Sequence, residues 1–133
     1  MNVKNFIIGT VAAGLVFYFL GWGLYGFLFK DIWPVAEGAV YNPITGFVAS
    51  LFSGAALSFI FSKIGSMNLQ SAAVTGGVIG LLNTVAMHLY MMASGTCNSM
   101  TTLMTDAGIN LVMGAVAGAA ISFLVGKFGG SNE

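Results

Sequence analysis

His88 and Asp106 are the ionisable side chains that fall well inside strongly apolar stretches of this sequence. Imidazole gains and loses protons near neutral pH, so a histidine and a carboxylate in an apolar environment could relay protons or contact a polar solute. The same pair could serve packing alone, with Asp106 stabilising the start of its helix through the helix dipole and fixing His88 by a hydrogen bond. Both interpretations stay open at the level of sequence.

Three more polar residues extend this set along the same stretches. Together they define a candidate polar site of Asn83, Thr84, His88, Asp106 and Asn110. Amides and hydroxyls inside a membrane commonly join helices, and they also line solute paths. The site therefore fits a helix contact and a small-solute pathway alike.

Sulfur-bearing residues gather near His88. Thioether, thiolate and imidazole together suit Cu(I), although methionine is also an ordinary filler of apolar cores. The candidate metal ligands are Met91, Met92, Cys97 and Met100, with Met87 and Met104 close by. The sequence calls for no other cofactor, and a single cysteine excludes a disulfide within the chain.

Patterns typical of enzymes are missing from the sequence. It contains no phosphate-binding P-loop, no zinc-protease histidine pair and no C-x-x-C. Its net charge is zero with four Lys or Arg, so it offers no basic surface for nucleic acid. We therefore expect neither catalysis nor nucleic-acid binding.

Composition indicates that lipid is the solvent of this protein. Of its 133 residues 57% are hydrophobic and 6% charged, whereas a soluble domain carries roughly a quarter charged residues. A helix crosses a bilayer with about 20 apolar residues, and four runs fit, over about 6–29, 44–62, 71–92 and 103–125. We predict an all-α membrane protein, a single domain of four transmembrane helices in an up-down-up-down bundle.

Small and polar residues recur every fourth position in the last two runs. The third run carries Gly76, Gly80, Thr84 and His88, and the fourth carries Asp106, Asn110, Gly114 and Gly118. Such stripes let helix backbones approach closely in lipid. With the helices antiparallel, one register sets His88 opposite Asp106, Thr84 opposite Asn110, Gly80 opposite Gly114 and Gly76 opposite Gly118.

The second run carries a similar stripe and clear end signals. Its small residues are Gly46, Ser50, Gly54 and Ser58, which should face protein, while Leu51, Phe52, Phe59 and Phe61 suit lipid. Asn42 and Pro43 suit a helix start, Gly65 a left-handed helix end, and Asn68 or Ser71 the next start. The short link predicts that the second and third helices are antiparallel neighbours.

Positive charge predicts the orientation. With alternating crossings Lys4, Lys63 and Lys127 fall on one side and Lys30 on the other. Because lysine and arginine are enriched on the cytoplasmic side, both termini should be inside.

The chain also resembles a family of small bacterial four-helix membrane proteins known as domain of unknown function 1761. The resemblance rests on Gly21, Tyr25, Phe29, Lys30 and Trp33 at the exit of the first helix, and on Asp106-Ala107-Gly108-Ile109-Asn110-Leu111-Val112 followed by Gly118-Ala119. It implies a bacterial inner-membrane location and this topology, and no activity.

The sequence leaves three functional hypotheses. The first is a structural or accessory membrane component, homo-oligomeric or bound to other membrane subunits. The second is a channel or transporter for a small solute or ion near Asn83, His88, Asp106 and Asn110. The third is copper handling at the methionine cluster.

Overall fold

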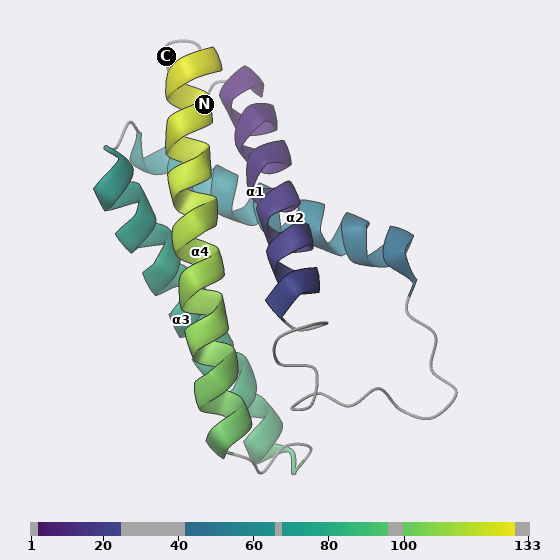
Figure 1. Ribbon diagram of the computed structural model, residues 1–133. Helices are drawn as coiled ribbons and strands as arrows, with labels where there is room; N and C mark the ends of the chain where they lie inside the picture. The colour runs from purple at the N-terminus through teal and green to yellow at the C-terminus, as the bar shows by residue number, and fades with distance from the viewer. Residues whose placement is uncertain (1–2, 25–41, 66–67, 96–99, 130–133) are drawn as a thin grey trace.

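The computed structural model describes residues 3–24, 42–65, 68–95 and 100–129. These residues form four helices, α1 (Val3–Gly23), α2 (Pro43–Ile64), α3 (Leu69–Ala93) and α4 (Met100–Phe128) (Figure 1). Each helix is long and apolar enough to cross a membrane. The predicted all-α architecture of four candidate spans is confirmed, while residues 25–29 of the first predicted run lie outside the described residues.

The predicted helix ends are also confirmed. The Asn42 side chain accepts hydrogen bonds from the backbone N–H groups of Ile44 and Thr45, at 3.0 and 3.2 Å, and Pro43 stands in the first helical position. Asn68 accepts from the backbone N–H of Ser71 at 2.7 Å and so starts α3. Gly65 ends α2 with a φ of 97°, which favours glycine because it has no Cβ.

Helices α3 and α4 form an antiparallel hairpin that is the most extensive contact in the molecule. Helix α1 packs along α4 in the opposite direction, with Gly9 near Ile121 and Gly21 near Met113. Figure 1 shows that the start of α1, the end of α2, the start of α3 and the end of α4 lie toward the same end of the molecule. The end of α3 and the start of α4 lie at the opposite end.

Helix α2 departs from the expected arrangement. In Figure 1 α2 runs from side to side, whereas α1, α3 and α4 run from top to bottom. Most of its contacts are with α1, and few are with α3 or α4. The prediction that α2 and α3 lie side by side is therefore wrong. A short link joins the ends of two helices, but it does not align their axes when a better packing surface lies elsewhere, here on α1.

The core is built mainly of small and branched side chains where the four helices meet. Its buried members are Ala13, Leu57, Phe61, Ala72, Ala117 and Ile121. Phe61 is 5% exposed, with its ring tip against Gly118. The prediction that Phe61 faces lipid is wrong, because Gly118 leaves a space on α4 that this ring fills. Leu51, also predicted to face lipid, contacts Gly14 of α1.

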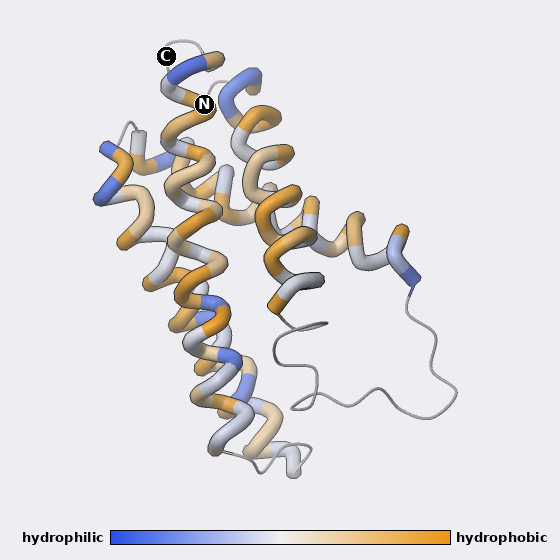
Figure 2. The backbone as a smooth tube through the Cα atoms, in the orientation of Figure 1, coloured by the Kyte–Doolittle hydropathy of each residue, from blue (hydrophilic) through white to orange (hydrophobic). Residues whose placement is uncertain are grey.

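Most residues along the four helices are hydrophobic, and hydrophilic residues lie at several helix ends and in the lower half of the α3–α4 hairpin (Figure 2). Phe52 of α2 is 73% exposed, as predicted for a side chain in lipid. The ammonium of Lys63 lies 5.3 Å from the Phe59 ring centre, and that of Lys127 lies 5.8 Å from the Phe123 ring centre. Lysines at the ends of apolar helices extend along such rings to reach water.

Candidate functional site

The candidate site lies on a hairpin whose backbones touch through glycine. A Cβ atom at Gly76 would fall on the carbonyl oxygen of Gly114, and a Cβ at Gly114 would fall on that of Gly76. A Cβ at Gly118 would meet the carbonyl of Ala72 in the same way. Only glycine permits this approach, so the predicted packing role of these residues on α3 and α4 is confirmed.

The stripes interdigitate. A Cβ at Gly76 would lie against Gly114 and 3.1 Å from the Cα of Gly118. A Cβ at Gly80 would lie against Asn110 and 3.6 Å from the Cα of Gly114. Each α3 glycine therefore sits between two α4 residues of the predicted stripe. Contacts that repeat every fourth residue on both helices are typical of ridges packed into grooves.

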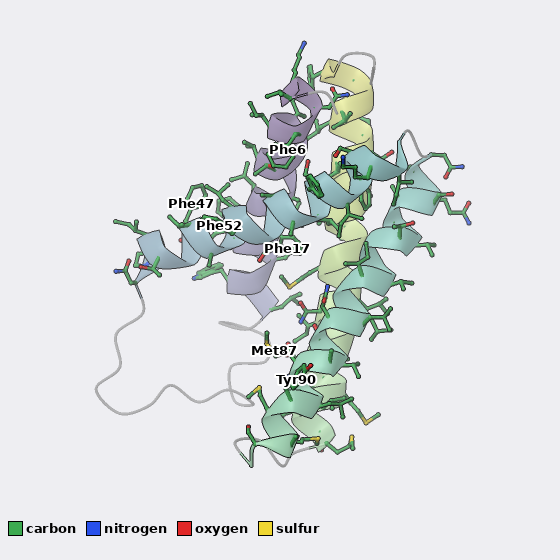
Figure 3. All side chains as sticks on the ribbon, turned by 180° about the vertical axis from the view of Figure 1, so that it is seen from behind. Phe6, Phe17, Phe47, Phe52, Met87 and Tyr90 are labelled. Atoms are coloured by element: carbon green, nitrogen blue, oxygen red, sulfur yellow. The ribbon has the colours of Figure 1, made fainter. Side chains whose placement is uncertain are left out.

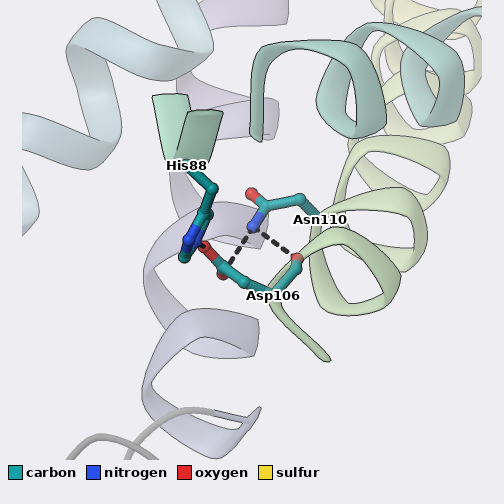
Figure 4. Close-up of polar contacts among 3 residues, drawn as sticks. All are labelled: His88, Asp106 and Asn110. Carbon is teal, nitrogen blue, oxygen red and sulfur yellow. Dashed lines mark hydrogen bonds and ion pairs between the residues drawn. The ribbon is translucent and has the colours of Figure 1, made fainter. Parts of the chain in front are cut away.

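At the outer end of this contact His88 reaches Asp106. The Nε2 atom of His88 lies 2.6 Å from Oδ2 of Asp106, and the two side chains are 6% and 17% exposed (Figure 4). With the carboxyl group ionised, Nε2 carries the hydrogen and donates it. The predicted pairing of these residues across the hairpin is confirmed.

Asn110 holds the carboxylate from the other side. Its amide nitrogen donates to Oδ1 of Asp106 at 3.0 Å and to the backbone oxygen of Asp106 at 2.9 Å (Figure 4). Each carboxylate oxygen thus accepts one hydrogen bond, from α3 at Oδ2 and from α4 at Oδ1. This arrangement fixes the rotamer of Asp106 and aims it at the imidazole.

The position of Asp106 corrects one interpretation made from the sequence. Helix α4 begins at Met100, and no acidic residue lies in its first turn. Since the effect of the helix dipole falls off beyond the terminal turn, Asp106 does not act by stabilising the helix start. Its contribution comes through His88 and Asn110.

The other two members of the predicted polar site, Thr84 and Asn83, lie on different sides of α3. Thr84 is buried on the α3 side that faces α4, one turn from His88. Asn83 is exposed, and no hydrogen bond joins its side chain to the part of the chain that the structure describes. The structure therefore brings together His88, Asp106 and Asn110, with Thr84 on the same stripe, and leaves Asn83 outside.

The small-residue stripe of α2 packs on α1. A Cβ at Gly54 would lie 2.5 Å from the backbone nitrogen of Gly14, and the Ser58 hydroxyl donates to the Phe6 carbonyl at 2.9 Å. The stripe thus faces protein, as predicted. The sequence did not reveal Phe6 as a partner, because its acceptor is a backbone oxygen.

The other half of the α2 stripe is less enclosed. Gly46 and Ser50 are half-buried, and the Ser50 hydroxyl donates to the Gly46 carbonyl of its own helix at 3.0 Å. Farther along α1 the ring of Tyr18 packs edge-on against Phe47, with centres 5.4 Å apart. The α1–α2 contact is therefore closest at Gly54 and Ser58.

The methionines lie around the end of the α3–α4 hairpin. Met91 and Met100 are exposed and Met92 is half-buried, while Cys97 lies outside the described residues. Figure 3 shows Met87, labelled, and other sulfur atoms at that end of the two helices. Within residues 3–24, 42–65, 68–95 and 100–129 no three His, Cys, Asp or Glu side chains come close enough to hold a metal ion.

No family model, curated protein or solved structure matches this chain. The resemblance to domain of unknown function 1761 stays a prediction. Chemistry at the site has to be argued from the His88, Asp106 and Asn110 geometry.

Proposed function

We propose that this chain is a small multi-pass protein of the bacterial inner membrane that acts as a structural or accessory subunit and not as an enzyme. The observation that supports the proposal is that the polar side chains between α3 and α4 form hydrogen bonds with one another. His88 binds Asp106 across the α3–α4 contact, and Asn110 binds Asp106 within α4. Buried polar groups satisfied in this way hold helices together in lipid.

The proposed topology has both termini in the cytoplasm. Lys4 lies in the first turn of α1, and Lys63 and Lys127 lie in the last turns of α2 and α4. These three helix ends lie toward the same end of the molecule (Figure 1). Positive charge favours the cytoplasmic side. The hairpin end, with His88 and Asp106, would then lie toward the outer face.

The proposal includes association with other membrane subunits, a second copy included. The glycine stripes do not supply that contact, because α1 and α2 use theirs on each other and α3 and α4 do the same. Support comes instead from the exposed faces of α2 and α3, which the other described helices leave uncovered.

Purification from native membranes in mild detergent tests this role. We expect a defined particle larger than the 13.8 kDa chain that keeps its size on dilution. A particle containing one copy and nothing else would contradict the proposal. Replacing His88 or Asp106 by alanine should lower the yield of folded particle.

One observation favours a second candidate, a proton or small-solute pathway. An ionisable pair between two membrane-spanning helices is a candidate functional site, and His88 with Asp106 is such a pair. Proton flux into liposomes containing the purified protein tests it. A flux that disappears in both His88→Gln and Asp106→Asn would favour the pathway, and a flux equal to that of empty liposomes would remove it.

A further inference from the structure

Asn83 presents its amide on an exposed side of α3, near the middle of this candidate membrane helix. It is the fifteenth of the 25 residues of α3, counting from Leu69. Its side chain is exposed and has no hydrogen bond within the described part of the chain. An unpaired amide costs free energy in hydrocarbon, because no water is available to bind it. Its position predicts a partner at the same depth.

Asn83 begins a row of exposed residues that are small or polar. The row continues through Ala86, Tyr90 and Ala93, and all four are exposed. Tyr90, labelled in Figure 3, is 79% exposed. The intervals of three, four and three residues are those of positions a and d of a heptad, the spacing of helices that pack along a seam. We call this row the α3 seam.

The α3 seam is separate from the contact with α4. Thr84 and His88 are buried and face α4, whereas Asn83 and Ala86 are exposed on another side of the same helix. Leu82 and Leu89 lie along one side of the seam and are 62% and 54% exposed, and Met87, 65% exposed, lies along the other side. A polar and small-residue row between large apolar side chains is typical of helix association in lipid, where small residues allow approach and amides bind.

We propose that the α3 seam binds the α3 seam of a second copy of this chain in a parallel, two-fold dimer. The proposal deepens the oligomeric role proposed above and rests on it. Copies inserted with the same orientation carry Asn83 at the same depth. An amide is self-complementary, since each carbonyl oxygen can accept from the NH2 group of the other copy. A two-fold contact supplies that pairing automatically.

The dimer assigns a role to each seam residue. A single asparagine at an a position sets the register of paired helices. Ala86, one turn farther, lets the helices approach. Tyr90 lies three residues before the end of α3, where its hydroxyl reaches the headgroup level that tyrosine prefers. The His88–Asp106 contact remains inside each copy.

Disulfide cross-linking in membranes tests the proposal. The background is Cys97→Ala, so that each variant carries one cysteine. Ala86→Cys places it on the seam. Val112→Cys, a residue of α4 that is 51% exposed, is the control for random collision. Under oxidation by diamide we expect a covalent dimer from Ala86→Cys at several times the yield from Val112→Cys.

Asn83 variants in the Ala86→Cys chain test the amide pairing. Asn83→Leu should lower the dimer yield about three- to tenfold, as expected for loss of interhelical hydrogen bonds in lipid, and Asn83→Gln should keep most of it. Equal yields from Ala86→Cys and Val112→Cys would overturn the α3 seam. An unchanged yield in Asn83→Leu would overturn the amide pairing.

The particle size separates this proposal from the one on which it rests. A particle larger than one chain with no cross-link at position 86 would overturn the seam and leave the accessory role standing. A particle of a single chain would overturn both. Because Asn83 is exposed in the single chain, Asn83→Leu and the unchanged protein should unfold at the same temperature when both are diluted in detergent to single chains. Equal temperatures there show that a lost dimer is not a misfolded one.

Discussion

At the scale of single residues, the structure turns two ionisable side chains into a helix contact. Asp106 accepts from His88 across the hairpin and from Asn110 on its own helix. The sequence predicted the His88–Asp106 pairing because both residues continue four-residue stripes. It did not predict that Asn110 would bind Asp106, since that bond depends on side-chain rotamers.

Asp106→Leu tests the hydrogen-bond pattern. Leucine has no acceptor, so the side-chain donors of His88 and Asn110 would lose the carboxylate oxygens to which they bind. We expect the free energy of unfolding to fall by about 1–3 kcal/mol, the cost of a buried polar group left without its partner. Unfolding in detergent measures it. Unchanged stability would mean that the carboxylate is not held as described.

At the scale of elements, the glycine stripes determine which surfaces meet. Periodicity predicted the stripe on each helix and that the α3 and α4 stripes meet, because residues four apart share a face. The predicted one-to-one register is only approximate, because Gly76 and Gly80 each lie between two α4 residues and not opposite Gly118 and Gly114. It did not predict that α2 would pack on α1 and not on α3. A small-residue stripe identifies which face of a helix packs against another helix, but it does not identify which helix packs there.

Two glycines of α4 offer a matched comparison. Gly114→Ala puts a Cβ onto the carbonyl of Gly76, whereas a Cβ at Gly108 meets nothing within 4 Å. We expect Gly114→Ala to cost about 1–3 kcal/mol through overpacking. Gly108→Ala should be neutral or stabilising by up to about 1 kcal/mol, because alanine favours helix. Thermal unfolding measures both, and equal effects would contradict the described contact.

Two serines of α2 allow a similar test of the α1–α2 contact. Ser58→Ala removes the hydroxyl that donates to the Phe6 carbonyl and should cost about 0.5–1.5 kcal/mol. Ser53→Ala changes an exposed hydroxyl and should have little effect. If both variants unfold at the same temperature as the unchanged protein, the Ser58 bond contributes nothing to the contact.

At the scale of the whole molecule, the four candidate spans follow from composition, and their arrangement follows from local fit. A chain with 6% charged residues cannot cover its surface with polar groups, so four spans could be predicted without any structure. The inclination of α2 could not, because it depends on how closely Gly54 approaches Gly14. Which surfaces meet other subunits depends in turn on that arrangement.

The proposed topology predicts which cysteines react from outside. In intact cells whose outer membrane is permeabilised, a membrane-impermeant maleimide should label Cys97, which lies between α3 and α4 in the sequence. In a Cys97→Ala background, Phe128→Cys at the end of α4, a position that is 54% exposed, should react only after the inner membrane is opened. The reverse labelling pattern would place the lysine-bearing end outside.

His88 and Asp106 join α3 and α4 at the outer end of their contact, and a double-mutant cycle measures that joining directly. The unfolding free energies of His88→Ala, Asp106→Ala and the double variant are compared with that of the unchanged protein. We expect the two losses to be non-additive by about 0.5–2 kcal/mol, because either change alone removes the same contact. Additive losses would contradict the joining of the two helices through His88 and Asp106.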